Sequence, residues 1–147
     1  MADASTLTIK RTITVRAVVT PRWKEEAERE LANAIANLDL QLSQLEQEGQ
    51  QVIDQIRRQS ANPLDPRVQE QVASVQQQVA AKRAELEEQK RQLLDQQRQV
   101  RDLEFDAVVE QGQLESSIDV TVGDNLVQKL QASILVRDGV IEAIDAP

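Results

Sequence analysis

The chain has no cysteine, no histidine and no tyrosine, and among its 147 residues it has one tryptophan, one phenylalanine and one methionine. The lack of cysteine excludes disulfides and thiolate metal sites. The lack of histidine removes the usual acid–base group and the commonest metal ligand of proteins. With so few aromatic side chains, burial must depend on Leu, Ile, Val and Ala. This composition favours a long, thin core over a bulky globular one.

Glycine is also scarce. The four glycines, at positions 49, 112, 123 and 139, form neither a P-loop nor a GxGxxG motif. Carboxylates are common, but Asp102, Glu104 and Asp106 alternate in a stretch that we expect to be helical, where this spacing scatters them around the axis. The loop at Gly123-Asp124 lacks the further ligands of a calcium loop. We therefore expect a non-enzymatic protein with no catalytic residue, no metal or cofactor site and no small-molecule substrate.

Long apolar runs are missing as well, and none approaches the ~18–20 residues of a membrane span. The first residues lack the basic and apolar regions of a signal peptide. We therefore expect a cytoplasmic protein that does not contact a membrane.

The formal net charge is −8, which makes the chain a poor general binder of phosphate backbones. The charge is uneven: residues 1–21 carry +2, residues 22–109 carry −5 and residues 110–147 carry −5. The opposite signs at the two ends suggest that the ends meet.

What the sequence does contain is a heptad pattern in its middle. Between residues 31 and 56 the apolar residues recur at steps of four and three, as in a coiled coil. They are Leu31, Ile35, Leu38, Leu42, Leu45, Val52 and Ile56, with Gly49 at the one position without a side chain. The pattern resumes at Val68, but Lys82, Gln89 and Gln96 occupy positions where an apolar residue is expected. Because these positions weaken the second run, we expect self-association, as a homodimer or higher oligomer.

Between the two runs the chain reads SANPLDPR, residues 60–67. Two prolines cannot lie inside one helix without a cost of about 3 kcal/mol each. Asp65 before Pro66 is typical of a helix start. The short connection predicts an antiparallel helical hairpin, an arm over residues 21–110 with its tip at 60–66. Folding about residue 63 would pair position 38 with about 88.

The tip is the candidate partner-binding site. One interpretation is a rigid turn, and the other is a contact point at which an exposed leucine meets a partner. The nearby arginines either complement the helix dipole or contact RNA or an acidic protein. The candidate residues are Arg57, Arg58, Asn62, Pro63, Leu64, Asp65 and Arg67.

The two ends of the chain alternate apolar and polar residues with a period of two, which predicts strands. One strand region spans residues 6–20 and another lies within 112–146, where Asp138-Gly139 indicates a hairpin. Residues 125–130 are either a short helix capped by Asp124 or a crossing segment. The predicted fold class is α+β: one domain over residues 1–147, with the helical hairpin inserted between terminal strands that form one small antiparallel sheet or partial barrel.

The segments ITVRAVVT, IDVTVGDNL and ILVRDGVIEAI, with the Gln-rich helical middle between them, resemble the YlqD family of uncharacterised bacterial proteins. No activity or catalytic residues are assigned to this family, so the resemblance implies a shared architecture and little more. Some family members are associated with genes for ribosome maturation. The leading hypothesis is a protein-interaction or scaffolding module, and the alternative is a ribosome- or RNA-associated factor. A membrane adaptor with a helical hairpin in a β module is a third hypothesis, by analogy of topology alone.

Overall fold

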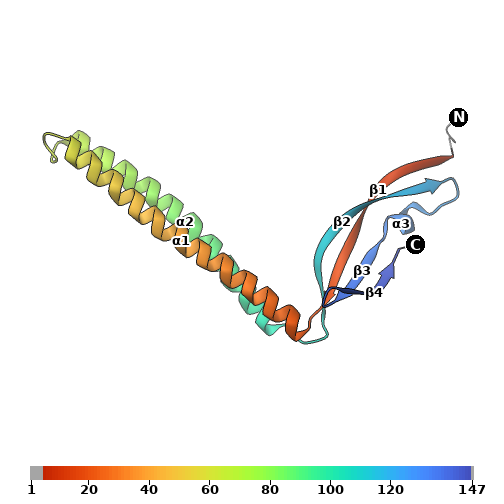
Figure 1. Cartoon of the computed structure of the whole chain (residues 1–147). Helices are drawn as coiled ribbons and strands as arrows, with labels where there is room; N and C mark the ends of the chain where they lie inside the picture. The colour runs from red at the N-terminus through yellow and green to blue at the C-terminus, as the bar shows by residue number, and fades with distance from the viewer. Residues whose placement is uncertain (1–4, 147) are drawn as a thin grey trace. The chain divides into compact units, whose positions relative to one another are not determined.

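The computed structural model describes residues 5–146. These residues form two compact units, which we call the β unit (residues up to Glu26 together with those from Asp102 onward) and the hairpin unit (Ala27–Arg101). The elements in chain order are β1 (Thr6–Val18), α1 (Pro21–Gln59), α2 (Pro66–Asp102), β2 (Val108–Thr121), α3 (Leu126–Leu130), β3 (Ser133–Arg137) and β4 (Val140–Asp145). The expected fold class, a helical hairpin between terminal strands, is confirmed (Figure 1).

Both long helices begin as their sequences predict. The side chain of Thr20 caps α1, because its Oγ1 accepts a hydrogen bond from the backbone N–H of Trp23 at 3.0 Å. Asp65 caps α2 in the same way, accepting from the N–H of Arg67 at 2.9 Å. Each cap is followed by a proline at the first helical position, where a missing N–H costs nothing. The caps therefore set where each helix starts.

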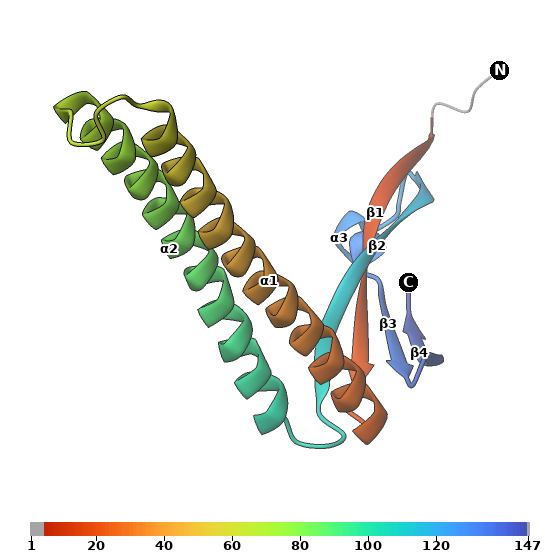
Figure 2. The same ribbon diagram turned by 60° about the vertical axis from the view of Figure 1, so that its left-hand side comes forward.

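The helices α1 and α2 lie side by side and antiparallel (Figure 2). Their seam buries Leu38, Gly49 and Ile53 of α1 against α2, which contributes Val72 and Leu86. The register differs from the prediction by about two residues. Folding about residue 63 would place Gly49 opposite position 77, whereas Gly49 lies against Val79. Residues 60–65 form the connection, so the point of reversal lies near residue 64.

The structure also corrects four of the positions that the heptad pattern placed along the seam. Ile53 is 7% exposed whereas Val52 is 43% exposed, so the stripe takes a second step of four at Gly49 and departs from the strict heptad at that point. On α2, Lys82, Gln89 and Gln96 are exposed. They leave no gap in the seam, because Arg83 and Lys90, one position further on, form ion pairs with Glu46 and Asp39 across it.

The four strands form one sheet in the order β2-β1-β3-β4. The sheet is mixed, and the expectation of a purely antiparallel sheet is wrong in this respect. β1 pairs antiparallel with β2 but parallel with β3. The reason is that the chain reverses after β2, so the next strand runs in the direction of β1, and β3 pairs with β1 rather than with β2.

Two local features at the C-terminal side also differ from the sequence prediction. β2 begins at Val108 instead of 112, because Val108 and Val109 pair with the end of β1 beyond an irregularity in the register. That irregularity breaks the period of two in the sequence. The short helix α3 forms, but its cap is Asn125, whose Oδ1 accepts from the N–H of Gln128 at 3.2 Å. The predicted hairpin at Asp138-Gly139 forms, and both residues have positive φ.

Candidate interaction site

The tip of the hairpin unit is a loop tied by its own side chains. Asn62 organises it: the Oδ1 atom accepts from the N–H of Leu64 at 3.1 Å, and its carbonyl oxygen accepts from the N–H of Asp65 at 3.0 Å. Ser60 Oγ adds two bonds, donating to the carbonyl oxygen of Asn62 and accepting from its N–H. These bonds satisfy the backbone of a turn whose φ angle is also fixed at Pro63. The loop is therefore held in place by its own hydrogen bonds.

Leu64 is 76% exposed at the centre of this loop. It is thus an apolar side chain held on an ordered backbone with little of its surface covered. The carboxylate of Asp65 accepts from the N–H of Arg67 at the start of α2. Asp65 and Asn62 therefore support the loop, whereas Leu64 remains available for contact.

The three arginines beside the loop are exposed, and none of them forms an ion pair with any residue between 5 and 146. Arg57 and Arg58 lie in the last turn of α1, and Arg67 lies in the first turn of α2. The remaining basic side chains of the hairpin unit all have an interaction within the chain: Arg29, Lys82, Arg83, Lys90, Arg91, Arg98 and Arg101. Uncompensated positive charge in the hairpin unit is therefore concentrated at its tip.

The structure thus brings all seven predicted tip residues to one end of the hairpin unit and divides them into two roles. Asn62, Pro63 and Asp65 shape the loop. Leu64 and the three arginines present an apolar and basic surface. Sequence reasoning missed the part of Ser60, although a serine two residues before an asparagine in a proline-rich turn is a signal for such a side-chain-to-backbone bond.

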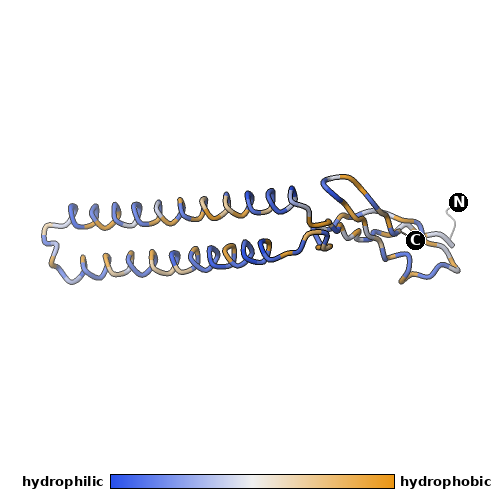
Figure 3. Tube along the Cα trace, turned by 90° about the horizontal axis from the view of Figure 1, so that it is seen from below, coloured by the Kyte–Doolittle hydropathy of each residue, from blue (hydrophilic) through white to orange (hydrophobic). Residues whose placement is uncertain are grey.

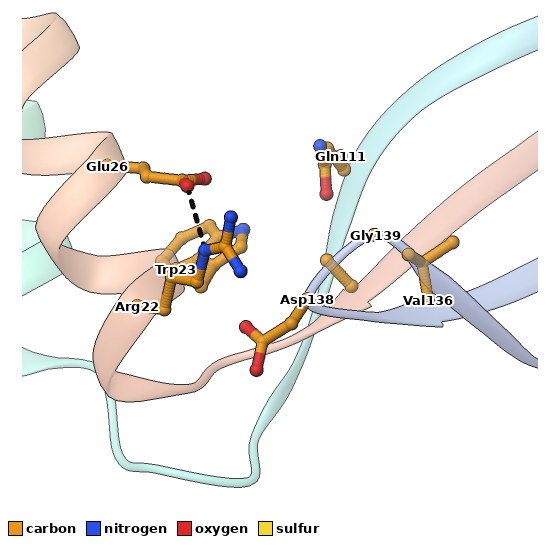
Figure 4. Close-up of a pocket in the computed structure, with 8 residues that line it drawn as sticks. Arg22, Trp23, Glu26, Gln111, Val136, Asp138 and Gly139 are labelled. Carbon is orange, nitrogen blue, oxygen red and sulfur yellow. Dashed lines mark hydrogen bonds and ion pairs between the residues drawn. The ribbon is translucent and has the colours of Figure 1, made fainter.

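The β unit has a hollow in its surface beside the start of α1 (Figure 4). It is a hollow of about 200 Å³, below the ~300–1,000 Å³ of common ligand pockets. Its charged groups already pair within the chain: Arg22 with Glu26 at 3.2 Å, and Asp138 with the hydroxyl of Thr20 at 2.5 Å. Trp23 also lines this hollow. The Nζ atom of Lys24 lies 4.9 Å from the ring centre of Phe105.

The titratable groups with shifted pKa values include Asp124, in the loop after β2, and Arg137, at the end of β3. The backbone N–H of Thr121 donates to the carboxylate of Asp124 at 2.8 Å and lowers the pKa of Asp124. Hydrogen bonds to Glu142 and then to Asp106 raise the pKa of Arg137. Over residues 5–146, no three Asp or Glu side chains are grouped so that they could hold a metal ion. In the same part of the chain, no helix is long and apolar enough to cross a membrane.

Comparison with known proteins adds family and fold. The family model described as YlqD protein matches residues 7–145. A crystal structure of a protein of unknown function from Synechococcus sp. WH 8102 is 74% identical, with a TM-score of 0.84. The similarity covers 98% of this chain and 97% of that one. The curated proteins gave no match.

Proposed function

The chain belongs to the YlqD family, and we propose that it is a non-enzymatic interaction module that presents the tip of its hairpin unit to a partner protein. The observation that carries the proposal is Leu64, 76% exposed on a loop that its own side chains hold in place. Arginine is enriched among interface hot spots, and three arginines lie beside this exposed apolar side chain. A loop that is already ordered loses little conformational entropy on binding.

The charges of the tip define the partner further. Arg57, Arg58 and Arg67 have no internal counter-charge among the described residues, so each is available to an external carboxylate. We expect the partner to offer an apolar depression for Leu64 that is bordered by acidic side chains. Complementary charges of this kind raise the association rate and select among partners more than they add affinity.

We place this function in the cytoplasm, and fractionation of the full-length protein would test that location.

A second candidate function is association with RNA or the ribosome, and the three arginines at the tip favour it. Phosphate groups could replace acidic side chains as their partners. Under this alternative the interaction would weaken steeply with salt and would depend on intact RNA.

The test is affinity capture with the full chain from native lysate, with and without nuclease. The tip variant carries Leu64→Ala with Arg57→Gln, Arg58→Gln and Arg67→Gln. The matched control carries the same kinds of change on the side of the hairpin unit: Leu94→Ala with Arg91→Gln, Arg98→Gln and Arg101→Gln.

A discrete protein that the wild type and the control recover after nuclease treatment, and that the tip variant loses, is the expected result. Material that disappears with nuclease and with the tip variant would favour the RNA alternative. A partner that the tip variant retains would overturn the assignment of the tip.

A further inference from the structure

One face of the sheet in the β unit is almost wholly apolar. Strand pairing places directly opposed residues on the same face, so Ile9 shares a face with Ile118, and Ile13 shares it with Leu114. β3 pairs in parallel with β1 and places Ile134 and Val136 on the same face. β4 pairs with β3 and adds Ile144 and Ile141 at the edge of the sheet. We call it the apolar face, and its apolar residues are Leu7, Ile9, Ile13, Val15, Ala17, Leu114, Ile118, Val120, Ile134, Val136, Ile141 and Ile144.

The opposite face of the sheet is polar along most of its length. On β1 it carries Thr8, Lys10, Thr12 and Arg16, and on β2 it carries Glu115 and Asp119 among others. The alternation is visible along the strands in Figure 3, where neighbouring residues change between hydrophobic and hydrophilic. A sheet with this pattern is built to bury one face against a second layer.

One charged residue, Arg11, also lies on the apolar face, opposite Ser116. Its guanidinium donates to the carbonyl oxygen of Lys129 in α3 at 2.9 Å. The charge is therefore tied to the short helix at one place on the face, and the apolar residues continue on both sides of it.

The β unit covers very little of the apolar face with its own residues. Its buried residues are four consecutive ones, Ala17–Thr20. Trp23 lines a hollow at the same end of the apolar face, together with Ala17 and Val136. Further along, Leu7 is 64% exposed, Leu114 and Ile141 are each 54% exposed and Ile144 is 66% exposed.

The area of the apolar face matches what a dimer of this chain requires. Thirteen paired residues of β1 and β2 form its long part, and β3 and β4 add a shorter part. At about 3.4 Å per residue and about 4.8 Å between strands, the face measures about 600 Å². Two such faces together supply about 1,200 Å², the lower bound of a stable interface.

We propose that the apolar face is the interface of a homodimer, in which the sheets of two copies pack face to face. A second copy is the occupant that the face itself fits: it brings an equally flat apolar surface of the same area, and a two-fold axis makes the contact self-complementary. Sheets packed in this way form an apolar layer about 10 Å thick between two polar outer faces. This inference is independent of the partner of the hairpin tip.

The test is sedimentation equilibrium of the full chain over a wide range of concentration. We expect a mass twice the 16.5 kDa of the chain. Ile144→Asp should reduce this to the mass of one chain, because the two-fold axis would bury two unpaired carboxylates. Ala143→Asp is the matched control, since it places the same charge one residue away on the opposite face, and it should leave the dimer intact.

A wild type that stays monomeric throughout the range would overturn the proposal. So would a dimer that survives Ile144→Asp with its circular dichroism intact, which would point to pairing at the edge of β2 instead.

If Ile144→Asp does not fold, a spin label decides the question without adding a charge. The chain has no cysteine, so Leu114→Cys and Ser117→Cys each create one attachment point, on the apolar and the polar face respectively. We expect immobilisation of the label at 114 and free motion of the label at 117. Equal mobility at the two positions would overturn the proposal.

Discussion

At Gly49 the two helices of the hairpin unit lie in close contact. A Cβ atom added there would lie 2.7 Å from Cγ2 of Val79. Real Cβ atoms do not tolerate that distance, and Val79 is β-branched and therefore stiff. The glycine weakens its own helix, so its presence reflects close packing rather than helix preference.

We predict that Gly49→Ala destabilises the hairpin unit. Helix propensity alone would stabilise it by about 1 kcal/mol, whereas overpacking costs about 1–3 kcal/mol, so the sign of the change separates the two effects. The measurement is urea unfolding followed by circular dichroism. In the double variant Gly49→Ala/Val79→Ala the added methyl group has room. Its loss of unfolding free energy should therefore be smaller than the sum of the losses in the two single variants. A more stable Gly49→Ala protein would contradict the packing shown by the structure.

Asp124 provides a prediction of pH dependence. Its pKa is lower in the folded chain than in the unfolded chain, where it is about 3.9, chiefly because the N–H of Thr121 donates to its carboxylate. The folded state therefore binds this proton less readily. The stabilisation is present above the unfolded pKa and is lost as the pH falls through the folded pKa.

We expect an NMR titration to place the pKa of the Asp124 carboxyl below its ordinary value. In Asp124→Asn the amide oxygen still accepts from Thr121 but does not titrate. Stability of the wild type should therefore decline more than that of Asp124→Asn as the pH is lowered below about 4. Parallel declines in the two proteins would show that this carboxylate does not contribute.

At the scale of elements, two ion pairs between α1 and α2 stabilise the hairpin unit in addition to its apolar seam. Asp39 pairs with Lys90 at 2.7 Å and Glu46 pairs with Arg83. The two pairs are one heptad apart on both helices, so they repeat with the period of the seam and define its register. Their side chains are partly exposed, which limits each pair to about 0.2–1 kcal/mol.

We predict that Lys90→Glu destabilises the hairpin unit by about 0.5 kcal/mol and that adding Asp39→Lys restores most of this. The measurement is a double-mutant cycle by urea unfolding at low salt. Repeating the cycle at about 1 M salt should remove most of the coupling, since the screening length is then about 3 Å. Coupling that persists at high salt would indicate packing of the side-chain stems rather than charge.

The elements also show how far the sequence alone determines this fold. Heptad spacing, the caps at Thr20 and Asp65 and the two prolines predicted both helices and their antiparallel return, because these are local signals. The register was about two residues off, since heptad spacing does not set the stagger between helices. The parallel pairing of β1 with β3 and the early start of β2 at Val108 depend on pairing partners distant in the chain.

For the candidate site, too, one part was predictable from local sequence signals and another part required the structure. The tip was predictable because Asn62, Pro63 and Asp65 act on neighbouring backbone. The lack of ion pairs at the three tip arginines required the structure, since it depends on where the other charges of the helices find partners. The apolar face was visible only as alternation in separate strands until their order and register were known.

At the scale of the whole molecule, a homodimer carries two hairpin tips. Two tips that engage one assembly bind with an avidity beyond that of either tip. The proposed dimer would also link stability to concentration, because a second copy would bind the folded chain and not the unfolded one.

We therefore predict that the thermal midpoint of the wild type rises with protein concentration, whereas that of Ile144→Asp stays constant. Circular dichroism melts at two concentrations about a hundredfold apart provide the measurement. The Ala143→Asp protein should follow the wild type. A wild-type midpoint independent of concentration would argue against the second copy.

The central position of β1 has a consequence for synthesis. Its partners begin at Val108 and Ser133, so the strand made first pairs with strands made last. Chains are made at about 5–20 residues per second, so about 5–20 seconds pass between the synthesis of β1 and that of β2. The hairpin unit, whose seam is completed in between, folds while Leu7, Ile9 and Ile13 are still without partners. A chaperone that shields this N-terminal segment on the nascent chain would act during that interval.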